Sequence, residues 1–395
     1  MYISSETRLF IREHSTDDVR TLALQSKKYP DVDMPVAITQ IAGRQIAAEK
    51  IPSWKKIEDI RYPKHLSLEQ CSSEITAYYK AGLLQGDSLT DLTGGFGVDC
   101  SFLAEKFKSV TYVERQEELC GIAAHNFPIL GLNHINVKNE DGIAHLKAMS
   151  PVDCIFLDPA RRNEHGGKAV AISDCEPDVA ALEGLLLNKA KQVMVKLSPM
   201  LDLSLALREL QQTQEVHIIS VNNECKELLI LLRQTSPAEI AIHCVNLLTK
   251  GTQEEQHLVF TREQEQRSQC TYTDSLGNYL YEPNASLLKA GAFRSIAAAY
   301  PVRKLHPNCH LYISDSFIEN FPGRIFRIVN QCSFNKKEVK ENLADLKKAN
   351  VTVRNFPATV AELRKRLHLT EGGDTYLFAS TLNNGQKVII RCEKV

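Results

Sequence analysis

The stretch DLTGGFGVDCSFLAEKF, residues 91–107, joins a short apolar strand to a helix through a glycine-rich turn. The strand ends at Asp91, and the turn holds Gly94, Gly95 and Gly97. Glycines lack a Cβ and let the backbone approach a ligand closely, while the amides at the start of a helix attract negative groups. The stretch therefore predicts a ligand site at the carboxyl end of this strand. Its D-x-T-x-G-x-G spacing differs from G-x-G-x-x-G, which argues against a dinucleotide.

Strands and helices alternate on both sides of this turn, and an amphipathic helix is predicted just before it, at 67–84. Short apolar strands are predicted at 88–93, 109–115, 134–139, 152–159, 191–198 and 215–222. Helical runs of about 10–15 residues separate them, an order that produces parallel strands joined by right-handed crossovers. We therefore expect an α/β fold with a Rossmann-like, doubly wound sheet. The apolar runs 227–233 and 240–248 would complete this sheet.

The chain divides into four predicted segments, because its 395 residues are too many for one ordinary core. Residues 1–66 place apolar side chains at three- and four-residue intervals, which predicts an N-terminal helical domain. Residues 67–262 hold the alternating α/β domain, and residues 263–321 form a less periodic, intermediate α+β segment. Residues 322–395 follow the order β-α-β-α-β-β, which predicts a compact C-terminal α+β domain.

The composition is typical of soluble globular proteins, because 43% of the residues are hydrophobic and 24% are charged. No run approaches the roughly 18 apolar residues of a membrane-spanning helix, and the first twenty residues lack an apolar leader segment. We therefore expect a cytoplasmic protein with no membrane partner. The eleven cysteines are scattered, without a CxxC pair or a Cys/His spacing typical of zinc, so we expect reduced core thiols and no metal.

Charge is distributed unevenly along the chain, although the net charge is only −1. Residues 286–395 hold 18 Lys and Arg against 9 Asp and Glu, whereas the other 285 residues hold 29 against 39. A basic segment attached to an acidic body favours a polyanionic partner. An ordinary difference in charge between two domains, without any function, would produce the same balance. Packing of the basic domain against the acidic body would do so as well.

Glu114 ends the strand that follows the glycine-rich turn, 23 residues after Asp91. A carboxylate at this position suits the two hydroxyls of a ribose. With these features, the segment from about Gln70 to Asn222 resembles a class I S-adenosylmethionine-dependent methyltransferase. The resemblance implies S-adenosyl-L-methionine as the cofactor. The implied cofactor contacts are Ser73, Asp91, Thr93, Gly94, Gly95, Gly97, Glu114 and Asp141. A nucleotide-binding domain without catalysis is the alternative.

The resemblance also implies a role for these positions. The turn from Asp91 matches the loop around the nucleotide and the methionine, with Thr93 where many members carry a glycine. Glu114 matches the acid that binds the ribose, and Asp141 matches the position that contacts adenine. Ser73 lies in QCSSEITAYYK, which resembles the helix segment that closes over the methionine end in nucleic-acid methyltransferases.

The fourth strand ends in the motif LDPARR. Methyltransferases that modify exocyclic amines of bases carry Asp/Asn-Pro-Pro-aromatic here, and the first residue accepts hydrogen bonds from the amine. The resemblance thus implies catalytic roles for Asp158, Pro159 and Arg161, with Asp158 orienting the acceptor. Ala160 and Arg161 replace the second proline and the aromatic of that pattern. RNA uridine C5-methyltransferases share a DPxR form, but they need a cysteine where this chain has Ser198.

Three further positions near strand ends are candidate substrate contacts: Arg162, Lys196 and Ser198. The adjacent Arg161 and Arg162 suit the clamping of a phosphate or stacking on a base. Alternatively, these arginines form salt bridges with acids of the same domain, for which the candidates are Asp99, Asp174 and Glu176.

Residues 322–395 are similar to THUMP-type RNA-binding domains in their strand–helix order and basic helices. The run at 284–312 resembles bacterial methyltransferases with a THUMP-like C-terminus, which implies tRNA or rRNA as the partner. Four aromatic residues lie among the basic ones: Phe293, Tyr300, Tyr312 and Phe326. Aromatic side chains beside cations suit base stacking together with phosphate contact.

These features predict an S-adenosylmethionine-dependent methyltransferase that modifies a base in a structured RNA. Two alternatives belong to other classes. One is a small-molecule methyltransferase whose added domains serve as lids or dimer contacts. The other is an RNA-binding protein that has lost methyl transfer, which the absence of the aromatic residue at Arg161 would allow.

Overall fold

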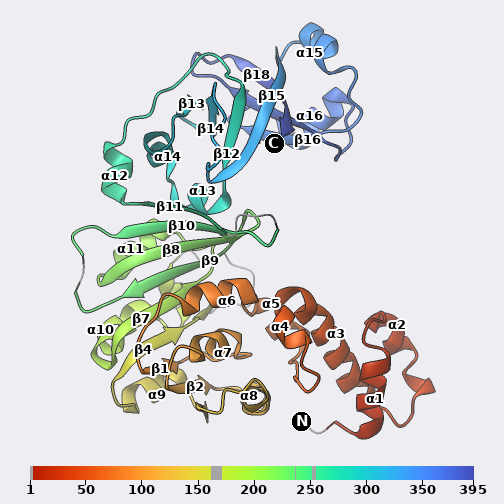
Figure 1. Cartoon of the computed structure of the whole chain (residues 1–395), viewed down its shortest axis with the longest axis vertical. Coiled ribbons are helices and arrows are strands. Elements are labelled where there is room, and N and C mark those ends of the chain that lie inside the picture. Colours follow the sequence, from red (N-terminus) through yellow and green to blue (C-terminus); the bar gives the residue numbers. More distant parts are fainter. Residues whose placement is uncertain (1–2, 162–170, 236, 251–254) are drawn as a thin grey trace. The chain divides into compact units, whose positions relative to one another are not determined.

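The computed structural model describes residues 3–161, 171–235, 237–250 and 255–395 (Figure 1). The chain forms two compact units. The first consists of residues 1–214 and 229–237, and the second of residues 215–228 and 238–395. Among the described residues, no helix combines the length and the apolar character that crossing a membrane requires.

The first unit begins with helices, as the periodicity of residues 1–66 predicts. They are α1 (Ser5–Glu13), α2 (Val19–Leu24), the 3-10 turn η1 (Ser26–Lys28), α3 (Met34–Lys50), α4 (Pro52–Lys55) and α5 (His65–Gln70). The side chains of Ser4, Asp18 and Asp33 each accept a hydrogen bond from a backbone amide in the first turn of α1, α2 and α3. These caps satisfy amides that the helix itself leaves without partners, and so fix where the three helices begin.

A parallel sheet with crossover helices follows. Its strands are β1 (Ser88–Asp91), β2 (Ser109–Glu114), β3 (Ile135–Asn139), β4 (Val152–Leu157) and β7 (Ala190–Leu197). Its helices are α6 (Glu74–Ala81), α7 (Val98–Ala104), α8 (Glu117–Ile129), α9 (Gly142–Ala148), α10 (Val179–Lys189) and α11 (Leu203–Glu209). Between β4 and α10 lie the short strands β5 (Ala160–Arg161) and β6 (Cys175–Glu176) and the 3-10 turn η2 (Ile172–Asp174). The pairs β1–β2, β1–β4, β2–β3 and β4–β7 are all parallel, as the alternation of strands and helices predicts.

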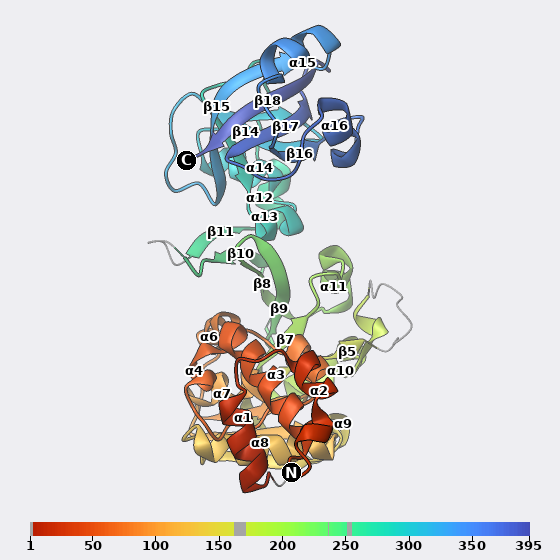
Figure 2. The ribbon, with the colours of Figure 1, turned by 90° about the vertical axis from the view of Figure 1, so that its right-hand side faces the viewer.

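A shared core joins the N-terminal helices to α7 and α8 (Figure 2). The rings of Trp54 and Tyr62 lie 5.2 and 6.3 Å from the ring of Phe96 between centroids. All three belong to one buried cluster, together with Phe102 of α7 and Ile122 of α8. Because Phe96 belongs to the glycine-rich turn, the N-terminal helices pack directly against that turn.

The sheet has nine strands in the order β11-β10-β8-β9-β7-β4-β1-β2-β3. The additional strands are β8 (Thr213–Val221), β9 (Glu224–Leu232), β10 (Ala241–Leu247) and β11 (Glu255–Phe260). Asn222 and Asn223 join β8 to β9 with φ of 49° and 70°, the geometry of a two-residue hairpin turn, so β9 is antiparallel to β8. β10 is parallel to β8, and β11 is antiparallel to β10. The apolar runs at 227–233 and 240–248 thus supply β9 and β10, and the predicted α/β fold is confirmed.

A second sheet lies in the C-terminal part of the chain. After α12 (Arg262–Arg267), its strands are β12 (Tyr279–Pro283), β13 (Arg303–His306), β14 (Cys309–Ser314), β15 (Gly323–Ser333), β16 (Asn350–Arg354), β17 (Thr375–Thr381) and β18 (Lys387–Lys394). Its helices are α13 (Ala285–Ala290), α14 (Phe293–Ala299), α15 (Lys336–Leu343) and α16 (Val360–Leu367). The strand order is β13-β14-β12-β15-β18-β17-β16. Because β12 pairs with β15, strands from the predicted segments 263–321 and 322–395 share one sheet.

Two of the four aromatic side chains predicted to stack on RNA bases are buried in this sheet. Tyr312 and Phe326 have no exposed surface, and the Tyr312 hydroxyl donates to the carbonyl of Phe293 at 2.6 Å. Phe293 stacks on His310 with 3.5 Å between ring centroids. Base stacking by Tyr312 and Phe326 is therefore a wrong prediction, because both residues point from their strands into the core.

Candidate active site

The glycine-rich turn between β1 and α7 is shaped closely by its protein neighbours. A Cβ on Gly94 would lie 2.1 Å from the Tyr112 ring, so a larger residue would displace that ring. Gly97 has a φ of +88°, which side chains other than glycine adopt only with strain. Asp91 is 1% exposed, and its Oδ1 accepts a hydrogen bond from the backbone N–H of Thr93 at 3.0 Å. Burial, reinforced by neighbouring carboxylates, raises the pKa of Asp91 well above its ordinary value.

Glu114 reaches the same turn from the end of β2. Its Oε2 accepts a hydrogen bond from the backbone N–H of Gly95 at 2.9 Å, and its Oε1 accepts one from the backbone N–H of Gln116 at 2.8 Å. The hydroxyl of Tyr112 donates to the carbonyl of Gly95 at 2.5 Å. The structure thus brings Asp91, Gly95 and Glu114 together, because β1 and β2 are adjacent and parallel and end at the same edge.

Asp141 and Ser73, two further predicted cofactor contacts, lie at helix N-termini. Oδ1 of Asp141 accepts a hydrogen bond from the backbone N–H of Ala144 at 2.9 Å and caps α9. A Cβ on the next residue, Gly142, would lie 2.3 Å from the carbonyl oxygen of Leu92. This close packing places Asp141 beside the loop that follows β1. Ser73 is the N-cap residue of α6.

Asp158 directly follows β4 and is tied to the loop after β1. Its backbone N–H donates to Oγ1 of Thr93 at 2.6 Å. Thr93 therefore connects the ends of two adjacent strands, a task that a glycine at this position could not perform. Pro159 follows, and Arg161 then pairs with β6 through the backbone. The predicted substrate contact Arg162 lies outside the described residues.

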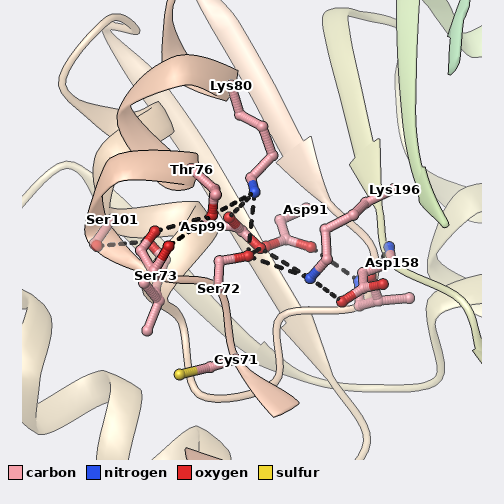
Figure 3. A network of polar contacts seen from close by, with 12 residues as sticks. Cys71, Ser72, Ser73, Thr76, Lys80, Asp91, Asp99, Ser101, Asp158 and Lys196 are labelled. Carbon is pink, nitrogen blue, oxygen red and sulfur yellow. Dashed lines mark hydrogen bonds and ion pairs between the residues drawn. The ribbon is translucent and has the colours of Figure 1, made fainter. Parts of the chain in front are cut away.

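A chain of alternating charges extends inward from Asp158 (Figure 3). Nζ of Lys196, on β7, lies 2.5 Å from Oδ2 of Asp158 and 3.4 Å from Oδ2 of Asp99. Nζ of Lys80, on α6, lies 3.2 Å from Oδ1 of Asp99. The hydroxyl of Ser72 donates to Oδ2 of Asp99 at 2.7 Å and lies within 3.3 Å of both lysine nitrogens. Two positive and two negative charges therefore alternate in this network.

The network becomes more buried from Asp158 towards Lys80. The side chain of Asp158 is 37% exposed, those of Lys196 and Asp99 are 11% exposed, and that of Lys80 is fully buried. Burial alone would raise the pKa of Asp99, but the positive charges of Lys80 and Lys196 outweigh it and lower the pKa to about 2. Asp158 is the most exposed of the four, so a substrate group can reach its carboxylate.

Sequence reasoning identified Asp158 and Lys196 but missed Lys80 and Ser72. A lysine in an amphipathic helix is ordinarily expected on the solvent face, and Lys80 is buried because α6 packs against α7, which carries Asp99. The third predicted substrate contact, Ser198, directly follows β7 and is partly buried. Its Oγ accepts a hydrogen bond from the backbone N–H two residues later, at 3.3 Å.

Family models match three parts of the chain. The model for protein-L-isoaspartate(D-aspartate) O-methyltransferase matches residues 37–163. A ferredoxin-like domain matches residues 279–322, and a THUMP domain-like family matches residues 323–394. A comparison with curated proteins gave no match.

One solved structure matches along the whole chain. It is that of a proposed methyltransferase from Porphyromonas gingivalis W83, with 34% identity, a TM-score of 0.87 and 100% coverage of both chains. An rRNA methylase from Streptococcus thermophilus matches 40% of this chain and 93% of its own, with 15% identity and a TM-score of 0.30. A SAM-dependent methyltransferase from Agrobacterium tumefaciens matches 41% and 60%, with 17% identity and a TM-score of 0.29. The chain belongs to the family of the Porphyromonas gingivalis protein and is a methyltransferase with the class I S-adenosylmethionine-dependent fold and a THUMP-like C-terminal domain.

Proposed function

We propose that this methyltransferase uses S-adenosyl-L-methionine to methylate a base in a structured RNA, either tRNA or rRNA. The observation that carries the proposal is the charge of the THUMP-like residues 323–394, which hold 14 Lys and Arg against 7 Asp and Glu. Exposed cations gather on and next to α15 and α16: Lys336, Lys337, Lys340, Lys347, Lys348, Lys365 and Arg366. Such a surface suits the phosphates of an RNA helix or loop.

The groups around the glycine-rich turn fit this cofactor by their chemistry. Glu114 offers carboxylate oxygens that suit ribose hydroxyls, and Asp141 lies beside the same loop. A Cβ on Gly95 would meet no atom nearer than 3.8 Å, so the backbone there leaves room for a ligand. When bound, the cofactor supplies a methyl group that is already activated on a sulfonium. We assign the cofactor to Ser73, Asp91, Thr93, Gly94, Gly95, Gly97, Glu114 and Asp141.

The task of the chain's own residues is then to align the acceptor and to accept its hydrogen bond. Thr93 holds the backbone of Asp158, and Lys196 holds Oδ2 of its carboxylate, so the orientation of this side chain is fixed from two sides. We assign Oδ1 of Asp158 to an exocyclic amine of the base. We further propose Pro159 and Arg161 as catalytic residues. We propose Arg162, Lys196 and Ser198 as contacts of the substrate.

We also propose a cytoplasmic location for this activity. All eleven cysteines are free, and eight of them are buried. Thiols persist in this state in a reducing compartment, which is also where tRNA and rRNA are available.

The test is transfer of a labelled methyl group from S-adenosylmethionine into total RNA from cells that lack this gene. Nuclease digestion of the product is expected to release labelled nucleosides, and Asp158→Ala protein is expected to give at least about a hundredfold less label in the same time. Label in a small molecule, or no label although the cofactor binds, would contradict the RNA proposal. The first result would favour a small-molecule enzyme and the second an RNA-binding protein without catalysis.

We expect reversal of charge on the THUMP-like surface to weaken RNA binding. The triple variant Lys336→Glu, Lys337→Glu and Lys365→Glu should raise the Kd for tRNA or rRNA at least about tenfold at low salt, since each lost phosphate contact removes counterion release. The slope of log K against log salt should fall by about 1 for each lost contact. Filter binding between roughly 50 and 200 mM salt measures both quantities. The control is Lys27→Glu with Lys28→Glu, two exposed lysines of η1, and an equal loss there would contradict a specific role for the THUMP-like surface.

The carboxylate of Glu114 should control cofactor affinity. Glu114→Gln keeps the shape of the side chain but removes the charge that strengthens bonds to hydroxyls, and we expect the Kd of S-adenosylmethionine to rise about 10- to 100-fold. Titration calorimetry measures this change. Glu117→Gln, in an exposed position on α8, is the matched control and should leave the Kd within about twofold. An unchanged Kd in Glu114→Gln would remove Glu114 from the cofactor site.

A further inference from the structure

The strands β8, β10 and β11 are neighbours in the nine-stranded sheet (Figure 1). Histidine and glutamate residues share one face of these three strands. His217 of β8 and His243 of β10 are direct partners in the parallel register. Glu215 lies two residues before His217 and therefore shares its face. His243 lies opposite Val259 of β11, so His257, two residues before Val259, points to this same face.

The donor atoms of three of these residues already lie close together. Oε2 of Glu215 is 3.6 Å from Nε2 of His243 and 3.9 Å from Nε2 of His217. One donor atom from each residue lies within 4.8 Å of the others. In a tetrahedral zinc site, with bonds of about 2.0–2.1 Å, neighbouring donors are roughly 3.4 Å apart. Small rotations of the side chains would therefore bring these donors around one ion.

A further histidine sets the orientation of His243. Nδ1 of His243 lies 3.2 Å from Nε2 of His257. When Nδ1 of His243 donates this hydrogen bond, its Nε2 keeps a lone pair, and that atom is the one that faces Glu215. Nδ1 of His257 lies 3.9 Å from Oε1 of Glu255, which continues the chain of polar contacts. Such an outer partner is typical of histidines that bind metals.

Burial differs among the three residues. His217 is buried, with 3% of its surface exposed, whereas the side chains of Glu215 and His243 are partly exposed. The rings of His217 and His243 stack with 4.3 Å between centroids and 14° between planes. Two imidazoles and one carboxylate suit zinc and its neighbours in the first transition series, whereas magnesium and calcium prefer oxygen ligands throughout.

We propose that Glu215, His217 and His243 bind one divalent ion of the zinc type, with His257 as the residue that positions His243. The ion would connect β8 to β10, and three protein ligands leave one coordination position open to water or another ligand. Sequence spacing did not reveal this site because its ligands come from separate strands and meet through the register of the sheet. The proposal is independent of the nature of the methyl acceptor.

The test is titration of the full-length chain, freed of metal by a chelator, with Zn²⁺ in a calorimeter and with Co²⁺ as a spectroscopic probe. One equivalent of each ion is expected to bind, and Zn²⁺ should raise the midpoint of thermal unfolding. His243→Ala and Glu215→Gln should each weaken the Kd for Zn²⁺ at least tenfold and remove the Co²⁺ absorption of a tetrahedral site. Both residues are partly exposed, so these variants are preferred to one at His217.

One control tests whether zinc binds elsewhere on the chain, and a second tests whether each variant folds. His65→Ala removes the histidine of another His–Glu pair, His65 and Glu69, which are 3.7 Å apart and exposed, and should leave the titration unchanged. Circular dichroism and melting without metal establish that each variant folds. Binding of one equivalent that persists in His243→Ala and Glu215→Gln would overturn the proposal, as would the absence of binding to the unaltered chain at equimolar metal. Failure of RNA methylation would leave this result unaffected.

Discussion

Replacing Asp158 with alanine is expected to lower the turnover number for methyl transfer about 10²- to 10⁴-fold, the range typical of a lost group that positions or deprotonates the acceptor. The carboxylate lies at the exposed end of the charge network, where an acceptor group can reach it, and Lys196 and Thr93 hold it in place. Single-turnover transfer from labelled S-adenosylmethionine into RNA measures the change. Cofactor affinity should stay within about twofold, because none of the groups assigned to the cofactor is altered.

Asp158→Asn separates the negative charge of this side chain from its ability to accept a hydrogen bond. An amide oxygen still accepts a hydrogen bond from an exocyclic amine, so we expect transfer slower than in the unaltered chain but faster than in Asp158→Ala. Transfer by Asp158→Ala at half the original rate or more would show that the acceptor is oriented by other residues. Equal losses in both variants would show that the negative charge, rather than hydrogen-bond acceptance, is required.

Replacing Asp99 with asparagine is expected to lower the free energy of unfolding by about 3–5 kcal/mol, because it leaves Lys80 buried without its ionic partner. Urea unfolding at neutral pH, followed by circular dichroism, measures this change. The matched control is Asp87→Asn, which removes the partner of Lys108 from an ion pair 3.0 Å long with both side chains more than 70% exposed. That change should cost less than about 1 kcal/mol. Equal effects of the two substitutions would contradict a structural role for the buried network.

The same variant has a defined pH dependence. The pKa of Asp99 is lowered from an ordinary 3.8 to about 2 in the folded chain, so the unfolded state binds a proton first as the pH falls. The stability due to Asp99 is therefore fully present above about pH 4 and is lost as the pH falls towards 2. The difference in stability between the unaltered chain and Asp99→Asn should shrink over this window. A difference that stays constant down to pH 2 would show that the carboxylate is not paired.

Acids at the ends of buried strands could be located from the sequence. Asp91, Glu114 and Asp158 each close a short apolar run, and parallel strands that alternate with helices must end at one edge of the sheet. Their proximity was therefore predictable without knowledge of any contact. The sequence also predicted that Gly94 belongs to the ligand-binding turn. A glycine is needed there because a Cβ would collide with the ring of Tyr112, and not only because a ligand needs room.

Other features depend on packing and register, which no local pattern specifies. Lys80 lies on a helix whose periodicity does not tell which face covers α7. Glu215, His217 and His243 meet because β10 aligns residue by residue with β8, and a different register would separate them. Tyr312 looked available to RNA because exposed and buried faces of a strand have the same spacing of two residues.

The pairing of β12 with β15 limits how evolution or engineering can use the THUMP-like part of this chain. Glu282 of β12 is 2% exposed and forms ion pairs with Arg324 and Arg354, which both lie beyond residue 322. A fragment that began at β15 would lose this carboxylate and present an unpaired strand edge to other proteins. A fragment of this domain that is to be moved to another protein should therefore begin at or before β12. A fragment without β12 is expected to aggregate through the exposed edge of β15.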